Sequence, residues 1–156
     1  MSAILHPPSA ALQAAIWQTI VEKSVLVRMD TVETCLGMDV EKINGLVDEG
    51  KLRWVWNFNN GGGGIRQLRF LALELFGPET VKGLTLDGVL RIILGETRKS
   101  FSATEIGRRF RLSRVSIYHL HHDGHLAGMV LEHTLKVKRD SLETFLRKRW
   151  IGGGLT

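Results

Sequence analysis

Cysteine and long apolar runs are nearly absent from this sequence, and each absence excludes a class of protein. The single cysteine, Cys35, rules out an intramolecular disulfide and a cysteine-rich zinc site, and it fits a reducing cytoplasm. No uninterrupted apolar stretch approaches the roughly 20 residues that span a bilayer, and the N-terminal segment lacks the basic region of a secretory signal. We therefore expect a cytoplasmic protein with no membrane partner.

Motifs for catalysis and cofactor binding are also missing. The glycine run at residues 61–64 has no Lys-Ser or Lys-Thr after it and no GxGxxG spacing, so a nucleotide site is not expected. His121 and His125 have the spacing of helical metal ligands, but Asp123-Gly124 ends the helix between them, and the glutamate of an HExxH motif is absent. No Ser-His-Asp order or acid pair stands out. We therefore expect no enzyme activity, no cofactor and no metal site.

Positive charge is concentrated in the second half of the chain. The whole chain has a formal net charge of +5 and a pI of about 9.7. Residues 1–77 carry 7 basic and 8 acidic side chains, whereas residues 78–156 carry 14 basic and 8 acidic side chains. This distribution favours a polyanionic partner that binds the second half.

Residues 100–126 have the pattern of two short helices joined by a tight turn. Ser102 and Glu105 form a capping box that starts the first helix, Ser113 is the expected N-cap of the second, and Gly124 ends it. Apolar residues at helical spacing give both helices one core: Ile106, Phe110, Leu112, Ile117 and Leu120. The pattern predicts a helix-turn-helix.

Hydrogen-bond donors cover the outward side of this predicted helix-turn-helix. Four arginines fall within seven positions, opposed nearby only by Glu105: Arg108, Arg109, Arg111 and Arg114. An ordinary solvated helix usually mixes charges of both signs. The second helix adds hydroxyl and imidazole groups suited to phosphates and base edges: Ser113, Ser116, Tyr118, His119 and His122. We predict that this segment binds DNA; the alternative is an ordinary polar helix face.

The same architecture occurs 74 residues upstream. The shift matches seven core or cap positions without a gap: Val32 with Ile106, Leu36 with Phe110, Met38 with Leu112, Ile43 with Ile117, Leu46 with Leu120, Gly50 with Gly124 and Leu52 with Leu126. We therefore interpret the chain as two tandem copies of one module. The second helix of the first copy exposes Val40, Lys42, Asn44 and Gly45 among carboxylates, which repel phosphate.

A β-hairpin is expected after the helix pair in each copy. In the first copy, β-forming residues flank a loop from Asn59 to Gly64, and the hairpin carries Arg53, Arg66 and Arg69. In the second copy, strands are expected at residues 128–131 and 135–137, with Lys136 in the second strand and Lys138 directly after it. We interpret the hairpins as the wings of winged helices and expect their cations to contact DNA.

The remaining segments complete the two modules. Packing helices are expected at residues 9–23 and 85–95, and a last helix from residue 140 or 141 to 150. Gly77-Pro78 is the expected boundary, because glycine and proline together break a helix. The predicted fold is mainly α with small β-hairpin wings, a tandem winged helix-turn-helix with modules at 1–77 and 78–150 and a flexible tail at 151–156.

The segment ATEIGRRFRLSRVSIYHLHHDGHLAG and the following LKVKRDSLETFL resemble the winged helix-turn-helix of phage excisionases and mercury-resistance-type (MerR) regulators. RLSRVSIYHL is also similar to the C-terminal helix-turn-helix of serine recombinases. The resemblance covers about residues 100–147. It implies phosphate contacts by Ser113 and Ser116, an approach of Arg114 and Tyr118 to bases or backbone, and a wing that carries Lys136 and Lys138. Arg111 departs from it, because this turn position usually holds glycine.

Together these patterns predict a sequence-specific protein for double-stranded DNA, associated with the nucleoid, and most simply a transcriptional regulator of a bacterial or mobile-element operon. Two alternatives stay open: a recombination directionality or excision factor, and a protein-interaction adaptor built from two winged helices. The expected partners besides DNA are a second copy of the chain or another DNA-bound protein. Salt-dependent retention on random duplex DNA distinguishes a DNA reader from an adaptor.

Overall fold

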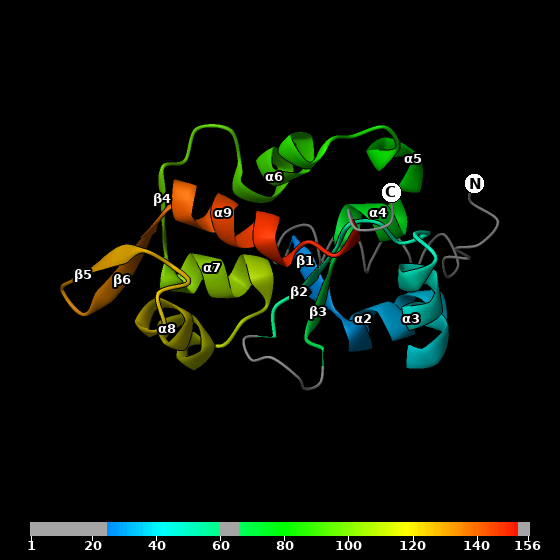
Figure 1. The fold of residues 1–156 in the computed structure, drawn as a ribbon, viewed down its shortest axis with the longest axis horizontal. Helices are drawn as coiled ribbons and strands as arrows, with labels where there is room; N and C mark the ends of the chain where they lie inside the picture. Colours follow the sequence, from blue (N-terminus) through cyan, green and yellow to red (C-terminus); the bar gives the residue numbers. More distant parts are fainter. Residues whose placement is uncertain (1–24, 60–65, 153–156) are drawn as a thin grey trace. The chain divides into compact units, whose positions relative to one another are not determined.

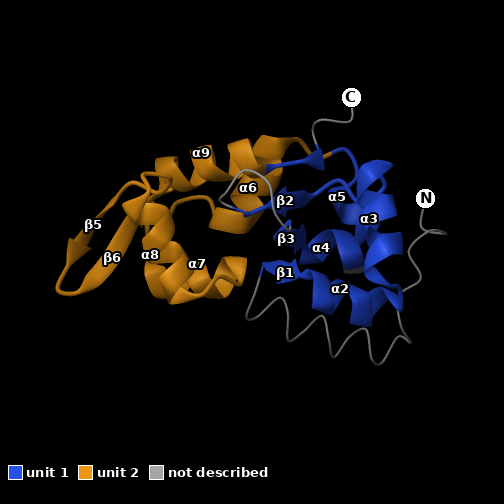
Figure 2. Cartoon of the chain, turned by 60° about the horizontal axis from the view of Figure 1, so that its bottom comes forward, with its two compact units in different colours: residues 1–83, 150–156 blue, residues 84–149 orange. Residues whose placement is uncertain are grey.

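The computed structural model describes residues 25–59 and 66–152, which form helices and two small antiparallel sheets (Figure 1). The chain divides into two compact units, residues 1–83 with 150–156 (unit 1) and residues 84–149 (unit 2), coloured separately in Figure 2. No helix among the described residues is long and apolar enough to cross a membrane. The expected helix at 9–23 and most of the expected glycine loop lie outside the described residues.

Unit 2 contains a strand, two helices, a hairpin and a last helix, preceded by one more helix. Its three-stranded sheet has the order β4-β6-β5, with both neighbouring pairs antiparallel. The elements are α6 (Leu86–Leu94), β4 (Ser100–Ser102), α7 (Ala103–Phe110), α8 (Arg114–His122), β5 (Gly128–Leu131), β6 (Thr134–Lys138) and α9 (Arg139–Arg149).

Local hydrogen bonds explain where the helices of unit 2 begin. Ser102 accepts from the backbone N–H of Glu105, whose carboxylate accepts from the N–H of Ser102, so the expected capping box starts α7. Ser113 caps α8 by accepting from the N–H of Ser116. Buried apolar residues from β4, α7, α8, β6 and α9 form the core beneath them, among them Phe101, Ile106, Phe110, Ile117, Leu135 and Leu142.

Unit 1 repeats this order of elements. Its sheet has the order β1-β3-β2, again antiparallel throughout. The elements are β1 (Leu26–Arg28), α2 (Met29–Leu36), α3 (Val40–Asp48), β2 (Val55–Asn57), β3 (Leu68–Leu71), α4 (Ala72–Phe76) and α5 (Pro78–Val81). Its core includes Val27, Val32, Ile43, Leu52 and Phe70.

The two units correspond residue by residue from residue 26 to residue 52 of unit 1. Adding 74 to the residue numbers carries the bounds of β1, α2 and α3 onto those of β4, α7 and α8. The step after the second helix is also the same, because the N–H groups of Lys51 and Leu52 donate to the Leu46 carbonyl as those of His125 and Leu126 donate to the Leu120 carbonyl. The equivalence therefore extends from the apolar pattern to individual backbone hydrogen bonds.

The unit boundaries differ from those expected from the sequence. The expected break at Gly77-Pro78 lies inside unit 1, because α5 follows it and the unit ends at Gly83. The described residues of the expected tail, 151 and 152, belong to unit 1, and the N–H of Ile151 donates to the Val55 carbonyl at 3.1 Å. Trp150, expected at the end of the last helix, also belongs to unit 1 and makes an antiparallel bridge with Trp56. Trp150 also stacks on Trp54, with ring centroids 5.0 Å apart.

In each unit, a side chain from the helix that directly follows the sheet accepts hydrogen bonds from the backbone at the start of the hairpin. In unit 2, the hydroxyl of Ser141 accepts from the N–H of Ala127 at 2.7 Å. In unit 1, the Glu74 carboxylate accepts from the N–H groups of Arg53 and Trp54 at 3.0 and 2.9 Å. Glu74 is only 7% exposed, and burial raises its pKa although both N–H donors and Arg53 oppose that shift.

Candidate nucleic-acid interface

The exposed side of α8 presents the residues expected there from the sequence. Arg114, His119 and His122 are exposed, whereas Ser116 and Tyr118 are half-buried. Val115 adds an apolar side chain that is 66% exposed. The inward side of the same helix buries Ile117 and Leu120, so the polar and apolar residues separate as expected.

The first turn of α8 is arranged to accept an anion. The Ser113 and Ser116 hydroxyls lie 2.9 Å apart and form one hydrogen bond with each other, which leaves one of the two protons to donate outward. No carboxylate lies in this first turn, and Arg114 is its first residue. Because the N-terminus of a helix carries partial positive charge, a phosphate here meets hydroxyl, guanidinium and backbone donors together.

Two side chains of α8 contact the hairpin formed by β5 and β6. The phenolic oxygen of Tyr118 accepts from the backbone N–H of Leu135 at 3.2 Å, just beyond the point where β4 stops pairing with β6. Arg114 donates to the His133 carbonyl at the hairpin tip over 3.4 Å, and its guanidinium lies 5.5 Å from the Tyr118 ring centroid. Helix and hairpin therefore form one connected surface.

The hairpin itself points its cations outward. Along β6, Leu135 and Val137 are buried, whereas Lys136 and Lys138 between and after them are exposed. Glu132 and His133 both have positive φ, the geometry of a tight two-residue turn whose twist matches the strands. As expected, Lys136 and Lys138 are exposed on the hairpin that follows α8 in unit 2.

The arginines of α7 take different roles. Arg108 and Arg111 are exposed, as a DNA contact requires. Arg109 was expected to contact DNA as well, but it turns inward: it donates to the Ile93 carbonyl at 2.8 Å, and its guanidinium lies 5.5 Å from the Phe101 ring centroid. Burial, with the Arg98 charge, lowers the pKa of Arg109. Arg109 therefore links α7 to α6 and has a structural role.

Arg111 occupies a backbone position that favours glycine. Its φ of 55° is left-handed, and the equivalent residue in unit 1 is Gly37, with φ of 62°. We expect Arg111→Gly to raise the free energy of unfolding of unit 2 by about 1 kcal/mol, because glycine adopts this conformation without strain. The same change should weaken DNA binding several-fold by removing a cation. Chemical denaturation and gel-shift titration measure the two effects, and Arg111→Asn, which also tolerates this conformation, controls for the backbone.

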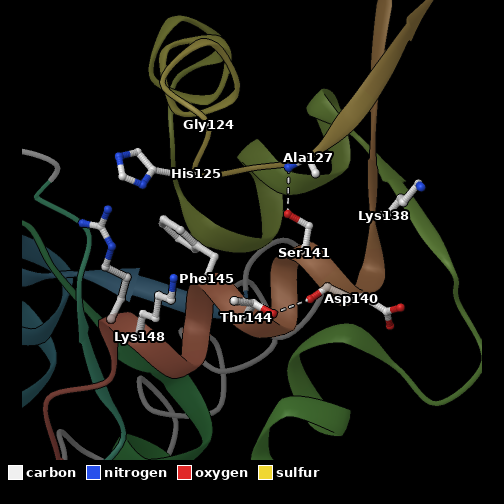
Figure 3. A pocket seen from close by; sticks show the side chains of 10 residues that line it. Gly124, His125, Ala127, Lys138, Asp140, Ser141, Thr144, Phe145 and Lys148 are labelled. Atoms are coloured by element: carbon white, nitrogen blue, oxygen red, sulfur yellow. Dashed lines mark hydrogen bonds between the residues drawn. The ribbon is translucent and has the colours of Figure 1, made fainter.

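A cavity of about 530 Å³ extends the basic surface of unit 2 beyond α8 (Figure 3). In Figure 3, His125, Phe145 and Lys148 gather at one end of the cavity, and Lys138 and Asp140 lie at the other. Arg149 also lines it, with its guanidinium 5.0 Å from the Phe145 ring centroid, and burial lowers its pKa. Arg147, Lys148 and Arg149 are adjacent in the sequence of the last helix, but the sequence pattern did not link Lys148 or Arg149 to His125.

Two other basic residues of unit 2 are engaged within the unit. Arg139 donates to the carbonyls of Gly95 and Arg98 and pairs with Glu143 at 2.8 Å. Arg147 pairs with Asp87. Both therefore hold α9 to the segment that includes α6 rather than adding to the exposed cations.

The cations expected on the hairpin of unit 1 are less available. Arg69 is 9% exposed and donates to the Leu68 carbonyl, so burial removes it from the predicted DNA contacts. Arg66 lies 3.6 Å from the Asp48 carboxylate of α3. Arg53 is exposed, with its guanidinium 4.9 Å from the Trp54 ring centroid. The outward side of α3 adds carboxylates, including Glu41 in its first turn.

Within residues 25–59 and 66–152, no group of three or more His, Cys, Asp and Glu side chains is placed to hold a metal ion. His121 instead makes a hydrogen bond from its Nδ1 to the Leu126 carbonyl at 2.8 Å. No protein-family model matches this chain, and comparisons with curated proteins and with solved structures give no significant match. The geometry of the site therefore carries the functional argument alone.

Proposed function

We propose that the protein binds double-stranded DNA sequence-specifically through unit 2, as a winged helix-turn-helix. In this proposal α8 is the recognition helix in the major groove, and the β5–β6 hairpin is the wing against the backbone. Unit 1 is a second winged helix-turn-helix with the same order of elements. The observation that carries the proposal is the connected surface of α8 and hairpin, joined by the Tyr118–Leu135 hydrogen bond and free of carboxylates on α8.

Charge supports the assignment of the reading role to unit 2. From residue 106 to 122 the sequence contains no aspartate or glutamate. The exposed cations there, Arg108, Arg111 and Arg114, are followed by Lys136 and Lys138 on the hairpin. Phosphate contacts by such residues position a protein on the duplex, and groups on α8 such as Ser116 and His119 then meet base edges.

Unit 1 has a different role in this proposal. Its α3 stands where α8 stands in unit 2, but it begins at Asp39 and carries Glu41 and Asp48. Carboxylates next to the phosphate backbone oppose binding. Arg53 is left as its available cation near the hairpin, so unit 1 contributes at most backbone contacts and leaves base reading to unit 2.

The proposal is tested by selecting preferred duplexes from a random pool and titrating them by gel shift at several salt concentrations. We expect a preferred sequence bound at least about 1000-fold more tightly than random DNA. We also expect log K to fall with log[salt] with a slope of about −4 to −5, as for five phosphate contacts. A chain that enriches no sequence and shows no salt dependence is a protein-interaction adaptor instead.

The same selected sequence distinguishes the two DNA-binding functions. A transcriptional regulator protects a site that overlaps a promoter, whereas an excision factor protects a recombination attachment site. The regulator is the simpler proposal and the excision factor is the alternative, because both need only the DNA contacts that this surface supplies. Footprinting on the natural DNA that surrounds the coding sequence separates these two outcomes.

A further inference from the structure

The outer strand of the unit 2 sheet exposes three large apolar side chains in a row. β5 is an edge strand, and Met129, Val130 and Leu131 are 58%, 53% and 54% exposed. Single exposed apolar residues are ordinary, but proteins usually protect a sheet edge with charge, proline or a bulge. β5 contains no charged residue and no proline. An unprotected apolar edge of this kind is suited to pairing with another strand.

The backbone of β5 has its remaining hydrogen-bonding groups directed outward at two positions. The N–H of Lys138 donates to the Ala127 carbonyl, and Met129 and Leu131 face Lys136 and Thr134 on β6. Hydrogen-bonded pairs alternate with non-hydrogen-bonded pairs along antiparallel strands, so residues 127, 129 and 131 form backbone hydrogen bonds with β6. The N–H and C=O groups of Gly128 and Val130 therefore point away from β6, toward the open edge.

Unit 1 shows what the equivalent edge does in this architecture. Val55 of β2 corresponds to Gly128 of β5, because Val55 faces Phe70 as Gly128 faces Val137. The outward carbonyl of Val55 accepts from the N–H of Ile151, and Trp56 bridges Trp150 in the antiparallel sense. An extended segment of the chain thus covers the edge of β2. In the described part of unit 2, no segment pairs with the outer edge of β5.

We propose that β5 pairs in an antiparallel manner with β5 of a second copy of this chain, so that two three-stranded sheets become one continuous sheet across a two-fold axis. The strand is self-complementary: with Val130 opposite Val130 of the second copy, Met129 lies opposite Leu131 of that copy, and apolar meets apolar at each pair. A two-fold axis requires this kind of self-matching surface. The inference goes beyond DNA binding and is tested without DNA.

The register of the pairing makes Val130→Pro a selective test in the full-length chain. Proline lacks the N–H that points outward at this position but leaves the β5–β6 hydrogen bonds intact, and it is tolerated on edge strands. We expect the wild type to have twice the 17.5 kDa monomer mass in sedimentation equilibrium at tens of micromolar. Val130→Pro and Leu131→Lys should raise the dissociation constant of the dimer at least about 50-fold.

The matched control is Ile92→Lys, which replaces a 40% exposed apolar residue of α6 in the same unit. It adds the same charge as Leu131→Lys, and the dimer should survive it. A wild type that stays monomeric at all concentrations overturns the proposal, as does a dimer that Val130→Pro leaves intact. The proposal is also overturned if the chain is monomeric and Leu131→Lys weakens DNA binding, because β5 would then contact DNA.

Cysteine pairs test the register directly. In the proposed sheet, Met129 of one chain and Leu131 of the second copy form a non-hydrogen-bonded pair. Their Cα atoms lie about 4.5 Å apart, which is within the range that a disulfide bridges. A mixture of Met129→Cys and Leu131→Cys chains should cross-link under mild oxidation at least about 10-fold faster than either variant alone. The native Cys35 is buried and does not compete. Equal rates in the mixture and in the separate variants contradict the register.

Discussion

Replacing Arg108, Arg111 and Arg114 together by glutamate is expected to lower the affinity for the preferred duplex at least about 100-fold. All three side chains are exposed, and they lie on the helix pair that carries the proposed base-reading surface. Reversal removes three phosphate contacts and adds three repulsions, and the salt slope should flatten by about three. Gel-shift titrations at several salt concentrations measure both effects.

The control has the same change in net charge but lies on unit 1. Arg28→Glu, Lys51→Glu and Lys82→Glu replace three other exposed cations, and none of them lies on α8 or its hairpin. We expect this variant to lose less than about five-fold in affinity, because surface charges that do not contact the DNA are largely screened at physiological salt. Circular dichroism checks that both variants fold. Equal losses would mean that net charge alone, and not the unit 2 surface, governs binding.

Glu74→Ala is expected to lower the free energy of unfolding of unit 1 by about 3 kcal/mol. The substitution leaves the N–H groups of Arg53 and Trp54 without their acceptor at a site where Trp54 is 1% exposed. All four tryptophans belong to unit 1, and the single tyrosine, Tyr118, belongs to unit 2. Tryptophan fluorescence during urea unfolding therefore reports on unit 1 specifically.

Glu74→Gln separates hydrogen bonding from charge at the same position. It keeps one acceptor oxygen, so its loss of stability should be smaller than that of Glu74→Ala. Because burial raises the pKa of Glu74 above its ordinary value of 4.5, the folded chain holds this proton more tightly than the unfolded chain. The stabilisation that comes from this tighter proton binding is thus fully present below pH 4.5 and is lost as the pH rises through the folded pKa, separately from the two hydrogen bonds that Glu74 accepts.

The difference in unfolding free energy between wild type and Glu74→Gln should therefore change across that pH window and be constant above it. Ser141→Ala is the matched variant in unit 2, where a neutral hydroxyl accepts from Ala127. It should lose less stability than Glu74→Ala, with no such pH dependence. Equal stability of Glu74→Ala and wild type would show that the carboxylate does not hold the hairpin of unit 1.

Local signals in the sequence predicted much of unit 2. The capping box of Ser102 and Glu105, the N-cap Ser113 and the strand at residues 128–131 lie where their patterns indicated. Each depends on neighbours a few residues away, so sequence alone contains the cause. The 74-residue shift likewise placed α2 and α3 correctly, since the apolar spacing of a helix is also local.

Side-chain direction and long-range contacts were not available from the sequence. Arg109 and Arg108 are adjacent in the chain, yet only Arg109 meets the Ile93 carbonyl, and that contact depends on how α6 packs. Arg69 was assigned to DNA from its charge, but the strand pairing buries it. The return of Trp150 to Trp56 joins residues far apart in sequence, and no local pattern encodes it.

Hydrogen–deuterium exchange with the selected duplex tests the central claim most directly, because it locates bound DNA on the full-length chain without substitutions. We expect slower exchange on binding in residues 113–122 and 132–138, which contain α8 and the turn and second strand of its hairpin. Residues 40–48 of α3 should exchange at the same rate with and without DNA. Slowing in 40–48 without any change in 113–122 would contradict the assignment of DNA reading to unit 2.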